Sequence, residues 1–331
     1  MLKQQEGAFA VPTMLNIAAV QGALYANWAT LAVKYPTLGT PAAAQEMAEG
    51  LINVLDQHEL ADPIGAVVPA PRVFEQVVRA IGSSQTDWSV FLRRLPVIEK
   101  CLHGFQPDKV AAVLNEGGKA GEQLRTTLKA SLQSVYAQAQ VNGICGWASI
   151  LAEDPDHYGR IQRLAAALQA SNHTIDTNAR TTAALAAIIG GEDKLPGRVT
   201  SYLASIGVQT PTSGWKSPGM RFALAAEFLR NLGWPGFKPD THIVRLFEQW
   251  IPDVLEQAAD DAREMANSLG FGDQTTTKNI QFSLAGLAIT PDGTSPSVAD
   301  NLLWLLGSQV HTTRHAKVHG YPQADTYFNF S

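Results

Sequence analysis

The most informative segment of the sequence reads Gly233-Trp234-Pro235-Gly236-Phe237-Lys238-Pro239-Asp240-Thr241-His242-Ile243. Pro239 disfavours a helical conformation at Lys238, so a helix can hardly begin before Asp240. Apolar residues then recur at helical spacing up to Pro252, namely Ile243, Leu246, Phe247 and Trp250. Asp240 therefore occupies the position of an N-cap, where a carboxylate accepts hydrogen bonds from the first amides of a helix.

A segment just upstream predicts a tight turn that opens another helix. It reads Lys216-Ser217-Pro218-Gly219-Met220-Arg221, and Pro-Gly is a turn-forming pair. The helix that follows has an apolar stripe made of Phe222, Ala225, Ala226, Leu229 and Leu232. Gly233 then ends the helix. The order is therefore hairpin turn, helix, Gly/Pro loop, carboxylate and helix.

This order resembles the helix-hairpin-helix glycosylases, a superfamily of base-excision repair enzymes. Their hairpin reads roughly L-P-G-V-G-x-K-T-A, followed by G-W-P and V-D-T-H. The matching positions here are Pro218-Gly219-Met220, Ala225, Phe228-Leu229, Gly233-Trp234-Pro235 and Asp240-Thr241-His242. A second block, residues 74–88, looks like the family's early helix and its S-x-Q-T loop. A third block, residues 88–111, is similar to the methyladenine glycosylase branch.

The resemblance implies an all-α, two-lobed HhH-GPD fold with the active site in the cleft between the lobes. We expect residues 73–235 to form a contiguous helical domain that contains the hairpin. Residues 1–72 and 236–331 are expected to form the second helical domain together. The implied activity is that of a DNA glycosylase, which flips a modified or damaged base out of the duplex and excises it. Asp240 would then be the catalytic carboxylate, stabilising the oxocarbenium-like transition state and orienting water.

The same resemblance suggests which residues touch DNA. Gln85 is expected to fill the space that the extruded nucleotide leaves. Contacts with DNA phosphates are expected from Lys216, Ser217, Gly219, Arg221 and Lys238. The substrate pocket is expected to include Trp88, Trp215, Trp234 and His242, although tryptophans more often belong to the core.

Three positions depart from the pattern of the family. Ala223 stands where members with lyase activity carry the Schiff-base lysine, so we expect a monofunctional enzyme. Arg221 replaces the second hairpin glycine, which lets the backbone approach a phosphate closely. Its side chain either contacts a phosphate instead, or the usual contact of the hairpin with DNA is lost. Ala80 matches a catalytic glutamate of the methyladenine branch. Asp240 is therefore the sole acidic candidate.

Composition sets further limits. The chain has 331 residues and 45% of them are hydrophobic, enough for one large core or two modest ones. Its two cysteines, Cys101 and Cys145, are too few for a four-cysteine iron–sulfur cluster or a disulfide framework. We expect no cofactor and no structural metal. We expect neither a membrane span nor a signal peptide, and therefore a cytoplasmic protein; we also expect a monomer.

The charge distribution is uneven. The formal net charge of −5 is unfavourable for a DNA-binding protein. Between residues 194 and 245, however, the only acids are Glu227 and Asp240. The same span holds seven basic residues: Lys194, Arg198, Lys216, Arg221, Arg230, Lys238 and Arg245. Because phosphate affinity depends on the local face, a basic site on an acidic protein is expected.

The hydrophobic pattern predicts helices almost throughout and no sustained alternation of period two. Outside the blocks already described, helices are expected near residues 14–33, 41–57, 88–100, 107–115, 119–141, 144–152, 157–170, 177–190, 198–206, 253–269 and 295–308. Loops are expected at 207–214, 270–277 and 290–295.

Histidines recur every four residues late in the sequence, at His311, His315 and His319. On a helix they would share one face, with Arg314 and Lys317 between them, and such a stripe can bind metal. No carboxylate or cysteine follows until Asp325. A solvated tail, or a cationic tail that faces phosphates, is therefore favoured over a metal site.

Two other functions remain open. The negative net charge and the altered hairpin favour an N-glycoside hydrolase that acts on a free nucleoside or nucleotide. A non-catalytic DNA-binding protein that retains the fold is the other alternative.

Overall fold

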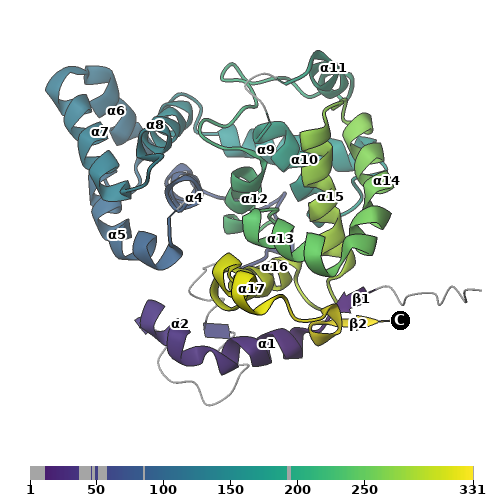
Figure 1. The fold of residues 1–331 in the computed structure, drawn as a ribbon. Helices are drawn as coiled ribbons and strands as arrows, with labels where there is room; N and C mark the ends of the chain where they lie inside the picture. Colours follow the sequence, from purple (N-terminus) through teal and green to yellow (C-terminus); the bar gives the residue numbers. More distant parts are fainter. Residues whose placement is uncertain are drawn as a thin grey trace, which may run out of the picture.

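The computed structural model describes residues 12–36, 46, 49–50, 58–84, 86–191 and 195–330. Over these residues the protein is all-α, as predicted, and 16 α-helices account for most of them (Figure 1). The helix expected at 41–57 lies largely outside the described residues. None of the described helices has both the length and the apolar character needed to cross a lipid bilayer.

One group of helices follows residue 69 and lies at the left of Figure 1. It consists of α4 (Ala70–Gly82), α5 (Trp88–Cys101), α6 (Pro107–Glu116), α7 (Gly118–Leu132) and α8 (Ala137–Glu153). α8 packs on α4, α6 and α7, and α5 packs on α7. α4 is amphipathic, and its buried apolar residues recur at helical spacing: Val73, Phe74, Val77, Val78 and Ile81.

A second group surrounds α10 (Asn178–Ile189), in which every residue from Thr181 onward is buried. A helix that is covered on all sides marks the centre of a core. The helices packed on it are α9 (His157–Ser171), α12 (Phe222–Asn231) and α15 (Gln274–Ala288). The remaining helices of the group are α11 (Gly197–Ser205), α13 (Thr241–Trp250), α14 (Pro252–Ser268) and α16 (Pro296–Leu305).

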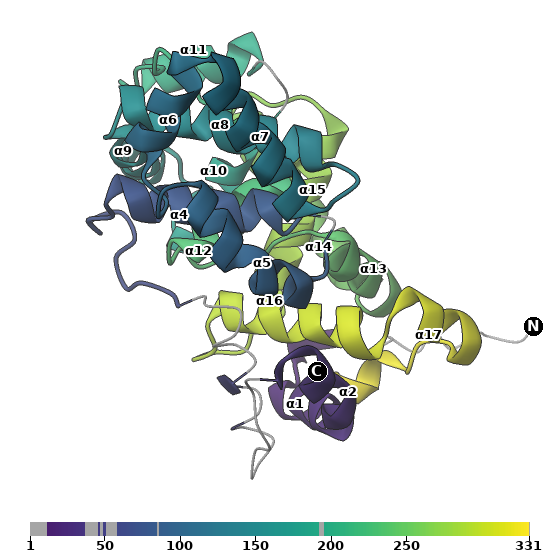
Figure 2. The ribbon, with the colours of Figure 1, turned by 90° about the vertical axis from the view of Figure 1, so that its left-hand side faces the viewer.

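Early and late segments of the chain meet in a two-stranded sheet. β1 (Pro12–Leu15) pairs antiparallel with β2 (Phe328–Phe330). Strands this short leave no alternation in the sequence, so the pattern did not predict them. Along the chain, α1 (Ile17–Ala26) and α2 (Trp28–Lys34) follow β1, while the π-helix η2 (Leu306–Val310), α17 (Thr313–His319) and the 3-10 helix η3 (Ala324–Thr326) precede β2 (Figure 2). α1 packs on α16 and η2.

Helix contacts cross the domain boundary expected at residue 235. α10 and α12 both pack on α15, and α12 also packs on α4 of the first group. The hairpin makes a very close link to the first group, because a Cβ on Gly219 would lie only 2.8 Å from the Cα of Gly143 in α8. The two groups of helices therefore meet along α12 and the hairpin.

Some helix boundaries differ from the prediction. The expected helix at 14–33 begins later, after β1, and breaks at Asn27 between α1 and α2. The expected helix at 119–141 ends at Leu132, because Gln133 adopts a left-handed conformation with φ 47°. α15 was not predicted, since its first turns are polar and its buried face includes small residues such as Ser283 and Gly286. The loops at 207–214 and 290–295 are confirmed, whereas the loop expected at 270–277 ends at Asp273, because α15 begins at Gln274.

Candidate active site

The loop that carries the candidate site begins where α12 ends. Gly233 adopts φ 90°, and a Cβ there would lie 2.5 Å from Leu60 Cγ. Only glycine fits such a position. The carbonyl of Gly233 also accepts a hydrogen bond from the backbone N–H of Leu60 at 2.8 Å. Residues 234–240 then run without regular structure to the start of α13.

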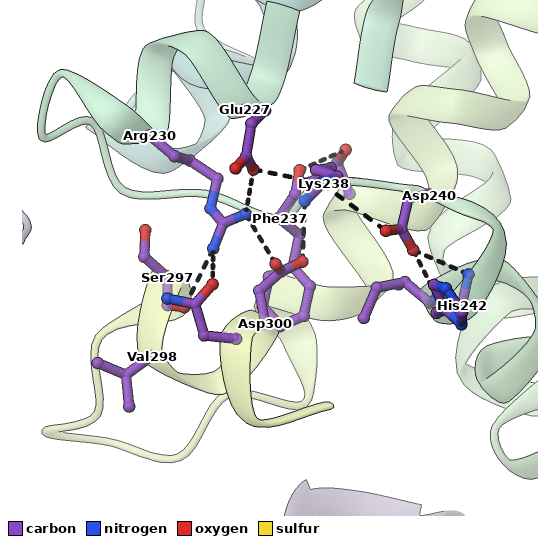
Figure 3. Close-up of polar contacts among 12 residues, drawn as sticks. Glu227, Arg230, Phe237, Lys238, Asp240, His242, Ser297, Val298 and Asp300 are labelled. Atoms are coloured by element: carbon purple, nitrogen blue, oxygen red, sulfur yellow. Dashed lines mark hydrogen bonds and ion pairs between the residues drawn. The ribbon is translucent and has the colours of Figure 1, made fainter. Parts of the chain in front are cut away.

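Asp240 caps α13, as the sequence predicts. Its Oδ1 accepts hydrogen bonds from the backbone N–H groups of His242 at 2.8 Å and Ile243 at 3.0 Å. Its Oδ2 lies 3.8 Å from Nζ of Lys238, and 17% of the side chain is exposed. Figure 3 shows the carboxylate between the first amides of α13 and the Lys238 side chain. One oxygen is thus fixed by the helix, while the other faces a cation.

Lys238 joins Asp240 to a buried charge network, which we define as Glu227, Arg230, Lys238, Asp240 and Asp300. Lys238 Nζ lies 3.4 Å from Glu227 Oε2, and the same oxygen lies 3.3 Å from Arg230 Nη1. Arg230 Nη1 is also 2.8 Å from Asp300 Oδ2. The backbone N–H of Lys238 donates to Asp300 Oδ1 at 2.9 Å (Figure 3). The Lys238 ammonium therefore faces two carboxylates, and since 19% of its side chain is exposed, its expected contact with DNA phosphates stays a prediction.

Burial sets the ionisation of this network. It raises the pKa of Asp300 to about 7, although Arg230 and the backbone amide of Lys238 act in the opposite direction. Burial alone would lower the pKa of Lys238, but the carboxylates of Glu227 and Asp240 hold that pKa above its ordinary value. Lys238 is therefore a cation at neutral pH, not an uncharged amine.

His242 lies on the first turn of α13, against α16 and η2. Its ring meets Trp304 edge to face, with 6.2 Å between the ring centroids. Burial lowers the pKa of His242, so its imidazole is neutral at pH 7. In η2, a Cβ on Gly307 would lie 3.3 Å from His242 Cβ and 3.0 Å from Leu246 Cδ1. η2 could not be predicted from the hydrophobic pattern, although π-helical turns often occur at functional sites.

The hairpin exposes only some of its expected DNA contacts. Gly219, with φ 72°, and Arg221 are both exposed. Ser217 is only 2% exposed, so its expected phosphate contact is corrected: it belongs to the packed base of the hairpin. Lys216 is half-buried, and its ammonium donates a hydrogen bond to the carbonyl of Gly191. Gly219 and Arg221 are the hairpin residues best placed to meet a ligand.

The three tryptophans expected in the substrate pocket belong to the core. The exposed fractions of Trp88, Trp215 and Trp234 are 8%, 3% and 0%. The indole N–H of Trp234 donates to the Tyr158 hydroxyl at 2.9 Å, and Trp88 stacks on Phe91 with 5.3 Å between ring centroids. This burial favours a role in the core, so the expectation that they stack on a base gains no support from the structure.

Sequence reasoning missed two exposed apolar residues that precede α8, the helix that also contacts the backbone of Ser84. Gln85 itself lies outside the described residues. Gln140 in α8 holds the loop, because its side-chain amide donates to the carbonyl of Ser84 at 2.8 Å. In the turn just before α8, Val135 and Tyr136 are 90% and 57% exposed. We call these two residues the apolar tip; its exposure could not be read from the sequence.

Metal ligands are not gathered anywhere in the described part of the chain: no three His, Cys, Asp or Glu side chains are arranged to hold an ion. The late histidines do follow one another, with 5.7 Å between the ring centroids of His311 and His315 and 4.7 Å between those of His315 and His319. His311, however, precedes α17, and its Nε2 lies 2.8 Å from the Tyr327 hydroxyl.

Two surface hollows lie away from Asp240. One, of about 410 Å³, is lined by residues of α4 and α5 that include Arg72 and Glu75. The other, of about 400 Å³, lies between α14 and α15. Comparison with known proteins gives no match: no family model matches the chain, and neither does any curated protein or solved structure. The function is therefore inferred from the residues of the site.

Proposed function

We propose that this protein is a monofunctional DNA glycosylase, which flips a modified or damaged base out of the duplex and hydrolyses its bond to the sugar. The observation that supports this most is Asp240, a carboxylate held at the N-terminus of α13 by two amide hydrogen bonds. A group fixed in this way stabilises developing charge without having to reorganise during the reaction. The HhH-GPD architecture forms part of the same proposal.

The second carboxylate oxygen would perform the chemistry. When the base leaves with the electrons of the glycosidic bond, positive charge develops on the sugar. Asp240 Oδ2 is 3.8 Å from Lys238 Nζ, beyond hydrogen-bond distance, and so has capacity to face that charge. The same oxygen would orient the water that attacks the sugar and accept its proton.

The lysines near the site favour hydrolysis without lyase chemistry. A lyase needs an uncharged amine to attack the sugar. Ala223 offers none, Lys216 donates to the carbonyl of Gly191, and Lys238 is held as a cation by Glu227 and Asp240. We therefore expect the reaction to stop at an abasic site.

The exposed parts of the hairpin and of α8 would bind the duplex. Gly219 and Arg221 lie at the surface before α12, where backbone amides and a guanidinium suit phosphate. Gly219 packs on Gly143 of α8, and the apolar tip, Val135 and Tyr136, precedes the same helix. Apolar side chains that enter a base step unstack it, which would assist base extrusion.

A second candidate function is a DNA-binding protein without glycosylase activity. The ion pair between Lys238 and Asp240 supports this alternative. The Lys238 ammonium faces the oxygen that catalysis requires, and only 17% of the Asp240 side chain is exposed. In this alternative Asp240 is a structural cap, and the charge network only joins α12, α13 and α16.

The decisive experiment offers the protein duplexes that carry alkylated, oxidised or deaminated bases and measures released base. Asp240→Asn keeps the capping ability, since Asn and Asp cap helices about equally well, but removes the charge. Asp273→Asn is the matched control, because Asp273 caps α15 through a hydrogen bond from the Thr276 N–H at 2.6 Å. We expect base release by the parent and by Asp273→Asn, and its loss in Asp240→Asn.

The other outcomes are equally informative. Undiminished release by Asp240→Asn would overturn the assigned role of Asp240. Salt-dependent binding to duplex DNA, with no base released from any substrate, would favour the second candidate. Release from mononucleosides but not from DNA would identify a nucleoside hydrolase instead.

A further inference from the structure

α17 carries positive charge but contributes no buried side chain. All seven of its residues are exposed or half-buried, and Arg314 and Lys317 are exposed. No ion pair involves either of these two residues in the described structure. The sequence has no acidic residue between Asp300 and Asp325. The helix therefore presents a cationic surface that no neighbouring acid in the sequence neutralises.

α17 is nevertheless held firmly in place. Arg245 of α13 donates to the carbonyls of Gly307 at 2.7 Å and His311 at 2.8 Å, and to the Thr313 hydroxyl at 2.5 Å. The Thr312 hydroxyl caps the helix by accepting from the backbone N–H of His315 at 3.1 Å. Of the three acceptors only Thr313 lies in α17, so Arg245 anchors the start of the helix and the η2 turn that leads into it.

That position is beside the candidate active site. Arg245, the main anchor, lies on the same helix that Asp240 caps, just over one turn further along. Gly307, to which Arg245 bonds, lies under His242. Figures 1 and 2 both show α17 next to α13, on the side of the molecule away from α6 and α7.

We infer that α17 is a contact surface for the sugar–phosphate backbone, in which Arg314 and Lys317 bind phosphates of a duplex that lies across the Asp240 site. This rests on the proposed function, because it takes the partner to be DNA. The chemistry fits, because cations three residues apart lie on neighbouring positions of one helical face and can both reach phosphates of a duplex.

The test measures binding of the whole chain to an undamaged duplex over a range of salt concentrations. Each phosphate contact adds about one to the slope of log affinity against log salt, so Arg314→Ala combined with Lys317→Ala is expected to lower that slope by about 2. The control is Lys109→Ala combined with Lys119→Ala, which removes two exposed lysines of α6 and α7 and leaves the slope unchanged.

Failure of this inference is distinguishable from failure of the proposed enzyme. If the α17 variant keeps the parent slope while bases are still released, the inference is wrong and the enzyme stands. If the slope falls but no base is released from any duplex, α17 binds DNA and the enzyme proposal fails. Absence of any duplex binding by the parent, or binding only to vesicles that contain phosphatidylserine, overturns the inference.

Discussion

The carboxylate of Asp300 lies 2.8 Å from the guanidinium of Arg230, and both side chains are almost fully withdrawn from solvent. Removing one partner of a buried pair destabilises a protein by about 3–5 kcal/mol, and here Arg230 would keep only Glu227 as a counter-charge among the described residues. We expect Asp300→Ala to lower the free energy of unfolding by that amount in urea titrations. Asp156→Ala breaks an exposed pair with Arg163 and should cost no more than about 1 kcal/mol. Equal effects of the two substitutions would contradict the buried charge network.

The pKa of Asp300 predicts how stability changes with pH. Because burial raises this pKa from 3.8 to about 7, the folded state binds the proton more tightly than the unfolded state. The contribution of Asp300 to the free energy of unfolding is therefore full below the unfolded pKa, falls as the pH rises towards 7, and is constant above that. Asp300→Asn removes this dependence. Thermal unfolding of both proteins from pH 4 to 8 measures it, and parallel curves would show that Asp300 does not titrate in this range.

The lowered pKa of His311 predicts the opposite change of the free energy of unfolding with pH. Burial, with the charges of His315 and Arg245, lowers its pKa from 6.5 to about 4. Its contribution to stability is present above pH 6.5 and is lost as the pH falls towards 4, because the unfolded state takes up the proton first. His311→Phe keeps a ring beside Trp250 and should be less sensitive to acid than the parent. If the stability of His311→Phe falls with decreasing pH as steeply as that of the parent, His311 does not cause the acid sensitivity.

The contact between Gly219 and Gly143 predicts a large effect of adding one methyl group. Gly219→Ala requires an unfavourable φ of 72° and brings its Cβ to 2.8 Å from the Cα of Gly143. Gly214→Ala has a similar φ of 74° but meets nothing within 4 Å. We expect a loss of about 1 kcal/mol for Gly214→Ala and at least twice that for Gly219→Ala, measured by chemical unfolding. Equal losses would mean that the backbones separate easily.

Borohydride trapping tests the absence of a reactive amine. With a damaged duplex as substrate, we expect no covalent enzyme–DNA adduct, because Lys238 stays protonated between Glu227 and Asp240. A glycosylase with known lyase activity serves as the positive control. If an adduct forms, its loss in Lys216→Met or in Lys238→Met identifies the amine.

The position of Asp240 could be predicted from the sequence because it depends on local rules. Pro239 restricts the residue before it, and the apolar spacing after Asp240 defines the helix. The partners of Asp240 could not be predicted. Asp300 reaches the network from α16, some sixty residues further along the chain, and only packing brings it to Arg230.

The tryptophans also show that tertiary contacts could not be predicted from the sequence. A tryptophan suits a core and a base-binding pocket equally well, and sequence spacing does not tell which way the ring turns. Trp234 finds its hydrogen-bond partner, Tyr158, on a helix more than seventy residues away. Conversely, Val135 and Tyr136 fall inside the helix expected at 119–141. In the structure they follow the left-handed residue Gln133, outside any helix, and are exposed.

The crossing of Gly143 and Gly219 has a mechanical consequence. No side chain separates the two backbones, so the hairpin cannot move towards α8 without displacing that helix. Because Gly143 and Tyr136 belong to the same helix and its N-cap, we expect a displacement of the hairpin at Gly219 to be accompanied by a displacement of the apolar tip.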